Sequence, residues 1–254
     1  MTSNRGITIT WLGHATTLIQ TPDGKRILID PWVQGNPAVP EQNKRIDQLD
    51  LMLITHAHQD HMGDAVPIAK ETDPEVVSIF DLSQYLSNKG VQNVNGMNKG
   101  GTVEWNGIRI TMVDAVHSAG FMENDTLMSG GSAAGYIIRF ADGFTVYHAG
   151  DTDVFESMRL IGRLYQPDLA LLPIGDHFTM GPWQAAEAIR MLGVKNVIPI
   201  HHGTFPILTG TPQRLEQEAG DVPNLRVIGL RPGDSVEQNE IISLSALARA
   251  LTVE

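Results

Sequence analysis

Short apolar runs bounded by turn residues recur along this chain of 254 residues. Residues 7–11, 16–21 and 26–29 read as strands, and Pro22-Asp23-Gly24 joins the last two as a hairpin turn. A similar unit returns at residues 135–140 and 144–148, around Ala141-Asp142-Gly143. An aspartate follows each unit closely, Asp30 or Asp151. The pattern predicts a single domain over residues 1–254 with two pseudo-repeated β-rich halves, although Asp-Gly hairpins also recur by chance.

Helical patterns alternate with further strands. Residues 182–192 carry Pro182 in the first turn, an apolar stripe every three to four positions and Gly193 at the end, which is typical of a helix. Helices are also expected at residues 81–89 and 211–219, and apolar strands at residues 49–55, 76–80, 108–113, 169–173, 197–200 and 225–230. The mixture predicts an α/β fold in which helices cover sheets.

Composition narrows the functional classes. Hydrophobic residues make up 42% of the chain, which excludes a disordered protein, and the absence of cysteine excludes disulfides, thiolate metal ligands and a cysteine nucleophile. Eighteen basic against 29 acidic residues give a net charge of −11, so nucleic acid is not an expected partner. No apolar run approaches the ~20 residues of a membrane span, and the start lacks a signal region. We therefore expect a cytoplasmic protein that acts on a small molecule.

The strongest chemical signal is His56-Ala57-His58-Gln59-Asp60-His61, which holds three of the nine histidines directly after an apolar strand. Imidazole and carboxylate are natural ligands for zinc and similar divalent ions. Positions 56 and 58 point the same way in an extended segment, whereas Asp60 and His61 turn elsewhere where a helix begins. One loop can thus serve two adjacent metals; a polar capping turn is the structural alternative.

Three further candidates stand just beyond apolar strands: His117, Asp151 and His201. A single histidine after a strand is more often a hydrogen-bonded structural residue. Four strand-end sites in one chain favour a shared metal centre, because the ends of strands that run in the same direction meet at one edge of a sheet.

With these motifs the chain resembles the metallo-β-lactamase superfamily. The resemblance rests on the HxHxDH signature at residues 56–61, on Gly150-Asp151-Thr152, and on the opening Trp11-Leu12-Gly13-His14-Ala15-Thr16 and Leu28-Ile29-Asp30-Pro31. Val116-His117-Ser118, Pro173-Ile174-Gly175-Asp176 and residues 200–205 look most similar to bacterial metal-dependent hydrolases related to ascorbate-6-phosphate lactonase and N-acyl-phosphatidylethanolamine phospholipase D. The resemblance implies a four-layer αβ/βα sandwich with metals at one edge.

The resemblance also implies a ligand set for two divalent ions. His56, His58 and His117 correspond to ligands of the first metal, Asp60, His61 and His201 to ligands of the second, and Asp151 to the carboxylate that bridges them. His201 is preferred over His202 because it ends its strand directly. Zinc is the expected ion, and manganese, iron and nickel suit the same ligands.

The implied activity is a dinuclear-metal-dependent hydrolase in which a metal-bridging hydroxide attacks the substrate. A lactone or another carboxylic ester or amide is the leading substrate class. A phosphodiesterase or phospholipase-D-like hydrolase is the alternative, and a non-catalytic metal-binding protein is a further one. Asp60 is expected to orient the nucleophile or move its proton, and His177 to contact substrate or protonate the leaving group.

Other residues have two readings each. His14 and Asp30 are expected to hydrogen-bond metal ligands, or else to be a turn histidine and a cap before Pro31. His148 lies near the site or inside its strand. The loop at residues 118–132 forms a lid or substrate wall, or packs on a neighbour or in an oligomer contact; a homo-oligomer is compatible with the resemblance. Core packing is expected for three aromatic residues near motif ends, with an apolar wall beside the site as the alternative: Trp32, Trp183 and Phe205.

Overall fold

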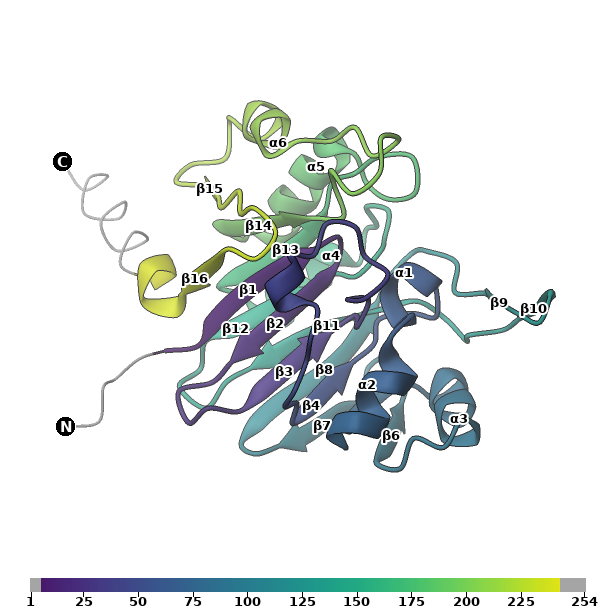
Figure 1. Cartoon of the computed structure of the whole chain (residues 1–254). Helices are drawn as coiled ribbons and strands as arrows, with labels where there is room; N and C mark the ends of the chain where they lie inside the picture. Colours follow the sequence, from purple (N-terminus) through teal and green to yellow (C-terminus); the bar gives the residue numbers. More distant parts are fainter. Residues whose placement is uncertain (1–5, 243–254) are drawn as a thin grey trace.

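Two seven-stranded sheets pack face to face in the computed structural model, which describes residues 6–242 (Figure 1). In order across the first sheet, the strands are β16 (Ser235–Glu237), β1 (Thr8–Gly13), β2 (Thr16–Gln20), β3 (Arg26–Ile29), β4 (Leu51–Leu53), β5 (Glu75–Ile79) and β6 (Val94–Met97). Across the second sheet they are β15 (Arg226–Val227), β14 (Asn196–Ile200), β13 (Leu169–Pro173), β12 (Thr145–His148), β11 (Ala134–Arg139), β8 (Ile108–Asp114) and β7 (Thr102–Trp105).

Each sheet contains an antiparallel hairpin followed by parallel strands. Strands β2 and β3 pair antiparallel around residues 22–24, and β11 and β12 pair antiparallel around residues 141–143, so both predicted hairpins are confirmed. From β3 to β6 and from β12 to β15 every neighbouring pair is parallel. These parallel strands place their carboxyl ends together, as a shared site requires.

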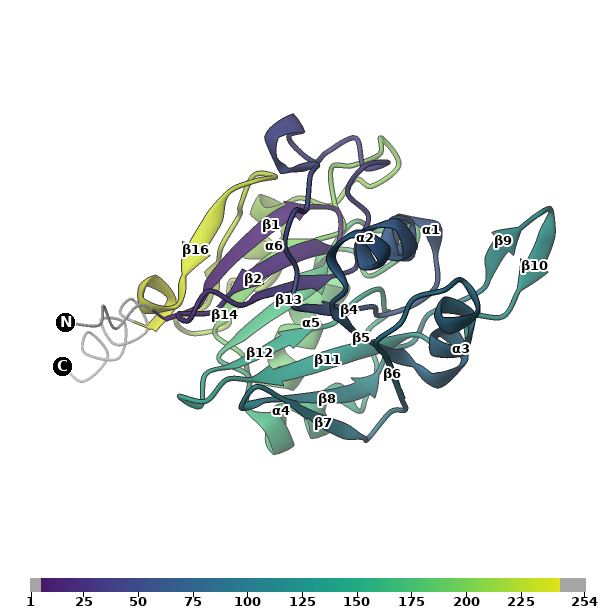
Figure 2. The same ribbon diagram turned by 60° about the horizontal axis from the view of Figure 1, so that its bottom comes forward.

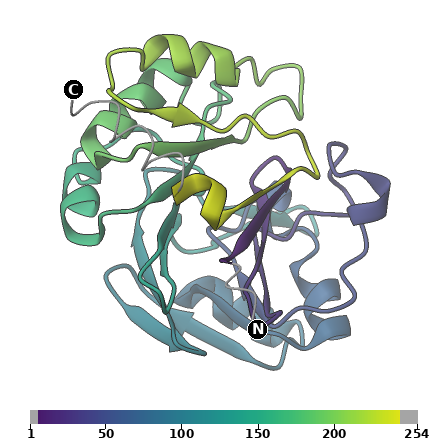
Figure 3. The ribbon, with the colours of Figure 1, turned by 90° about the vertical axis from the view of Figure 1, so that its left-hand side faces the viewer.

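Helices cover the outer faces of both sheets (Figures 2 and 3). The labelled helices are η1 (Glu41–Asn43), α1 (Gln59–Met62), α2 (Ala65–Thr72), α3 (Phe80–Asn88), α4 (Met158–Tyr165), α5 (Pro182–Leu192) and α6 (Pro212–Glu218), and residues 238–242 are also helical. Residues of α2 and α3 join the core of the first sheet, and those of α4, α5 and α6 pack on the outside of the second. The four-layer αβ/βα sandwich predicted from the sequence is confirmed.

Strands β11 to β14 of the second sheet are buried on both faces, since the first sheet covers one face and helices cover the other. In β11, Tyr136 and Ile138 face the first sheet, whereas Ile137 faces the helices. Strand β13 repeats this with Leu169 and Leu171 on one side and Ala170 and Leu172 on the other. This explains why the sequence shows near-continuous apolar runs there rather than alternation.

Several predicted elements differ from those observed. The strands expected at residues 49–55 and 225–230 shrink to β4 and β15, since the flanking residues leave the sheets. The loop at residues 118–132 contains a hairpin of β9 (Phe121–Glu123) and β10 (Thr126–Met128), anchored by the Phe121 ring on Tyr85. Among the described residues, no helix has the length and apolar character needed to cross a membrane.

Candidate metal centre

The predicted ligands come from the ends of strands in both sheets. His56, His58, Asp60 and His61 lie in the turn and short helix α1 that follow β4. His117 lies beyond β8, Asp151 beyond β12, and His201 directly after β14. The two sheets meet here, since the Ala134 N–H donates to the Thr55 carbonyl and the Tyr136 hydroxyl donates to the Ile54 carbonyl. The site therefore stands on the common edge of the sandwich.

Unusual backbone geometry presents these side chains. Gly150 has φ +61°, and a Cβ there would lie 2.7 Å from that of Thr55, so only glycine fits before Asp151. His14, Asp30 and His201 also have positive φ, between 52° and 56°. Non-glycine residues in the left-handed region cost free energy and gather at functional sites.

The side chains form two groups, and within each group one ligand atom from every residue lies within 4.8 Å of all the others. The first group is His56, His58, His117 and Asp151, and the second is His14, Asp60, His61 and His201. An Asp151 carboxylate oxygen (Oδ2) also reaches the second group, at 3.2 Å from His61 Nε2 and 3.0 Å from His201 Nε2. All seven predicted ligands are therefore brought together, with Asp151 between the groups.

The polar atoms that face each other here fit a bound cation. His61 Nε2 and His201 Nε2 are buried close to Asp151 Oδ2 but make no hydrogen bond of good geometry among the described residues. His201 Nδ1 and Asp151 Oδ1 are also buried there without a hydrogen bond. His58 Nδ1 faces His56 Nε2 at 2.9 Å and His117 Nε2 at 3.3 Å. Buried polar atoms are normally paired, so this crowding of nitrogens and carboxylate oxygens needs an explanation, and divalent metal ions supply one.

Neighbouring side chains fix the tautomers of two ligands. Asp30 accepts hydrogen bonds from Thr55 Oγ1 and His61 Nδ1, each at 2.8 Å. Because the Thr55 hydroxyl proton is used by Asp30, its oxygen accepts from His56 Nδ1 at 3.0 Å. The Nε2 lone pairs of His56 and His61 are thereby directed at the centre, as ligation requires. Asp30 was expected from the sequence to hydrogen-bond a metal ligand, whereas Thr55 carries no sequence signal.

His14 contacts a ligand from the other side. Its Nε2 lies 2.9 Å from Asp60 Oδ2, and its Nδ1 lies 3.0 Å from Thr204 Oγ1. A carboxylate only accepts, so Nε2 donates to Asp60 and Nδ1 accepts from the Thr204 hydroxyl. Burial lowers the pKa of His14 to about 4, which keeps it neutral near pH 7. Thr204 had no sequence signal.

The carboxylates and His61 shift one another's pKa. Although burial alone raises the pKa of Asp151, His201 and His61 hold it well below its usual value. Burial likewise opposes ionisation of His61, yet Asp151 and Asp30 raise its pKa well above the usual value. Burial lowers the pKa of His56, His58 and His117. The first group is therefore ready to bind metal near neutral pH, whereas an ion must displace a proton from His61.

Metal-free protein should lose stability on mild acidification. The folded-state pKa is lowered for His14, His56, His58, His117, His148 and His202. Their unfolded forms bind protons as pH falls below about 6.5 while the folded forms resist, so stability declines in that window. The raised pKa of His61 acts in the opposite sense. Urea unfolding should show a loss of at least about 3 kcal/mol between pH 7 and pH 5; equal or greater stability at pH 5 would contradict these shifts.

The remaining predicted residues lie outside both groups. His177 is exposed with φ +57°, and its ring contacts Phe178. His148 is buried in β12, where its Nδ1 accepts from the Gly150 N–H. His202 stacks on Trp11 at 4.9 Å and does not join either group, which agrees with the preference for His201.

Core packing was the wrong expectation for two of the three aromatic residues. Trp32 is buried, but Trp183 is 65% exposed in the first turn of α5 and Phe205 is 36% exposed. Both belong to segments at the metal-bearing edge, where side chains face solvent beyond the strand ends.

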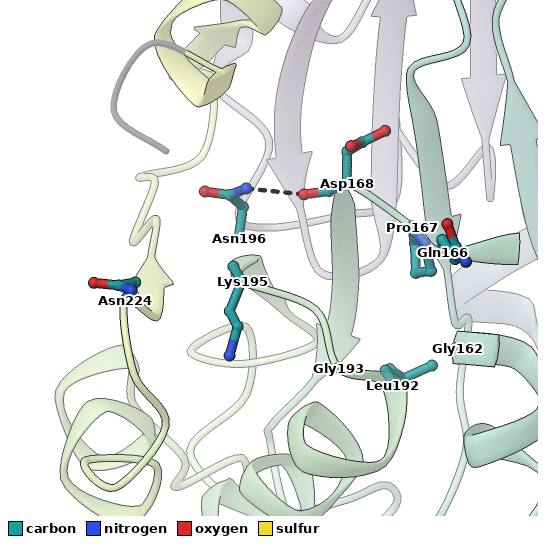
Figure 4. A pocket seen from close by; sticks show the side chains of 9 residues that line it. All are labelled: Gly162, Gln166, Pro167, Asp168, Leu192, Gly193, Lys195, Asn196 and Asn224. Atoms are coloured by element: carbon teal, nitrogen blue, oxygen red, sulfur yellow. Dashed lines mark hydrogen bonds between the residues drawn. The ribbon is translucent and has the colours of Figure 1, made fainter. Parts of the chain in front are cut away.

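A separate polar pocket lies at the opposite edge (Figure 4). It is formed where α4 and α5 end and where β13 and β14 begin, and the Asn196 side chain donates to the Asp168 carbonyl at 2.9 Å. It contains none of the predicted site residues.

The fold and the His/Asp cluster define a metallo-hydrolase-like α/β sandwich. The sequence model described as "Beta-lactamase superfamily domain" matches residues 25–202. Because this match covers more than half of the chain, the chain belongs to the beta-lactamase superfamily, as the motifs predicted.

Known relatives narrow the family further. A UPF0173 metal-dependent hydrolase of Koribacter versatilis is 53% identical over 224 residues, which cover 87% of this chain and 96% of the relative. A second UPF0173 metal-dependent hydrolase, from Methanopyrus kandleri, is 44% identical over 231 residues, which cover 91% of this chain and 99% of the relative. The solved structure of Igni18, a metallo hydrolase from Ignicoccus hospitalis, matches with a TM-score of 0.80 at 37% identity over 91% of this chain and 97% of that one. This chain is thus a member of the UPF0173 family of metal-dependent hydrolases. The finer resemblance to ascorbate-6-phosphate lactonase and the phospholipase D branch stays a prediction.

Proposed function

We propose that this protein is a hydrolase that uses two divalent metal ions, zinc in the first instance, to cleave a lactone or another carboxylic ester or amide. The observation that supports this most is the position of buried Asp151 between two groups of candidate ligands, where His61 Nε2, His201 Nε2 and Asp151 Oδ1 are buried without a hydrogen bond. One ion would be held by His56, His58 and His117, and the other by Asp60, His61 and His201. Asp151 would be a ligand of both ions. Bound ions of this kind make water nucleophilic near neutral pH and polarise the target carbonyl.

The reaction adds the oxygen of water to the carbonyl carbon and breaks the bond from that carbon to the leaving oxygen or nitrogen, which takes up a proton. Asp60 serves this step by orienting the water. Burial alone raises the pKa of Asp60, but the hydrogen bond from His14 and the neighbouring His61 lower it below its ordinary value. So acidic a carboxylate accepts a hydrogen bond from water rather than keeping its proton.

We assign protonation of the leaving group, or contact with it, to His177. Its exposed ring follows the end of β13, and the adjoining loop is tied to the site because the Met180 N–H donates to the carbonyl of Thr152, next to Asp151. Replacement of His177 by Gln should lower kcat by about tenfold to a hundredfold for an ester with a poor leaving group and much less for a nitrophenyl ester. Equal effects on both esters would exclude this role.

A turnover panel tests the proposed reaction. Metal-free protein is reloaded separately with zinc and manganese and given a lactone, an aryl ester, an aryl phosphodiester and a β-lactam. The proposal predicts metal-dependent cleavage of the lactone or ester, and a loss of at least about a hundredfold in Asp60→Asn. Asp221→Asn serves as the matched control, because Asp221 is exposed and pairs with Arg190 away from the site, and it should keep nearly full activity. Cleavage of the phosphodiester alone would overturn the carboxylic reading in favour of a phosphodiesterase.

A further inference from the structure

The loop that follows His201 carries an aromatic surface beside the second ligand group. The Phe205 ring lies 5.7 Å from the His14 ring and 6.0 Å from the Trp32 ring, and Trp32 itself lies 5.2 Å from His14. We call Trp32 and Phe205 the aromatic wall. Trp32 forms its buried base, and Phe205 exposes about a third of its surface to solvent. A partly exposed aromatic ring two contacts away from metal ligand Asp60 is well placed to meet substrate.

The aromatic wall is held in place by the same hydrogen bonds that orient Asp60. Thr204, next to Phe205, donates to His14 Nδ1, and His14 Nε2 donates to Asp60. The His14 carbonyl accepts from the His201 N–H at 2.8 Å and from the Trp11 indole at 2.8 Å. The wall and the metal ligands therefore form one connected unit.

An exposed apolar residue directly precedes a candidate ligand of the first group in the sequence. Val116 is 48% exposed directly before His117. Its backbone is fixed on both sides, because its N–H donates to Thr152 Oγ1 and its carbonyl accepts from the Asp153 N–H. An exposed apolar side chain on a well-anchored backbone offers contact area to a ligand.

Free cations are missing from the loops around this centre. The segments at residues 54–64, 115–133, 149–157, 174–181 and 201–211 contain no Lys or Arg, and the segment at residues 30–50 contains two. Those two are each paired with a carboxylate, Lys44 with Glu41 and Arg45 with Asp47. The lysine beside the end of β8 and the arginine in the loop that packs on Gly13 are paired as well, Lys99 with Asp114 and Arg231 with Asp234. Acidic residues such as Asp153 and Asp176 are exposed in these loops. Beyond the reach of a bound metal ion, sites that select phosphate or carboxylate groups place Arg or Lys against them.

From the exposed apolar residues and the lack of free cations, we propose that the aromatic wall and Val116 bind an uncharged, apolar acyl or alkyl group. The natural substrate then carries no phosphate or carboxylate beside the scissile bond. The inference rests on the proposed hydrolytic function and adds the substrate's chemical class. Phe205 is the residue that determines this specificity, and Thr204 is the residue that positions it.

A series of nitrophenyl esters from acetate to octanoate tests the proposal, with mono-nitrophenyl glutarate as the anionic member. On metal-loaded protein, kcat/KM should rise about twofold to fourfold per methylene over the first members. The anionic ester should be at least about tenfold poorer than a neutral ester of equal chain length. Phe205→Lys should reduce the preference for the neutral ester at least about tenfold, whereas Leu164→Lys, a change of an exposed residue on α4, should leave it unchanged.

Binding of unreactive ligands separates this inference from the proposed function. Hexanamide should bind the metal-loaded protein more tightly than glutaramate, measured by quenching of tryptophan fluorescence, and Phe205→Lys should reverse the order. Hydrolysis of esters without a preference for neutral chains, together with equal binding of both amides, would overturn the substrate class and leave the hydrolase intact. Preferential binding of hexanamide without hydrolysis of any ester or lactone would support the apolar site and overturn the proposed reaction.

Discussion

Replacing Asp151 by Asn is expected to abolish tight binding at both metal positions and to lower activity at least about a thousandfold, since bound metal contributes several kcal/mol to such reactions. Asp151 is 2% exposed and is the residue whose carboxylate reaches both groups. Asparagine keeps the side-chain volume and removes the negative charge that the surrounding histidines and the two proposed cations would share. Metal content after dialysis and turnover of the best ester measure the two effects.

Asp153→Asn is the matched control for that experiment. Asp153 is two residues further along and exposed, and its Oδ1 accepts only from the neighbouring Val154 N–H among the bonds described. It should keep both metals and nearly full activity. If Asp151→Asn kept two tightly bound ions, Asp151 would not be the shared ligand.

Loss of Asp30 should damage both stability and metal binding. Its carboxylate is fully buried and accepts from the Thr55 N–H, the Thr55 hydroxyl and His61 Nδ1, each at 2.8 Å. Asp30→Ala leaves these donors without a partner, so we expect a loss of about 3–5 kcal/mol in the free energy of unfolding. Asp30→Asn should fold, yet hold the ion at His61 about tenfold to a hundredfold less tightly.

Asp50→Asn is the control, because Asp50 accepts from the Arg26 N–H at the other end of β3 and is only partly buried. Chemical unfolding and chelator competition measure the two effects. If Asp30→Asn bound metal as tightly as the unchanged protein, Asp30 would have only a structural role, as a cap of the turn before Pro31.

The sequence predicted that the seven candidate ligands lie close together, because their positions follow from strand topology. Parallel strands must place their carboxyl ends together, so His117, Asp151 and His201 could be grouped with the histidine-rich loop before any contact was known. The hairpins around residues 22–24 and 141–143 were equally readable, since Asp-Gly turns encode them locally.

What the sequence did not reveal depends on tertiary contacts. Thr204 and Thr55 are ordinary polar residues whose roles arise only when folding places them against His14 and His56. The left-handed backbone of His14 and His201 has no sequence signature comparable to glycine. The exposure of Trp183 reverses the usual expectation for tryptophan, because α5 begins at the open edge of the sandwich.

The most direct test of the account is the number of ions that the chain binds. Metal-free protein is titrated with zinc against a chromophoric chelator, and bound metal is counted after gel filtration. We expect two tightly bound ions per chain in the unchanged protein. In His117→Ala, the ion of the first group should bind more weakly, whereas the ion of the second group should stay tightly bound. A single tightly bound ion in the unchanged protein, or none, would contradict a shared two-metal centre around Asp151.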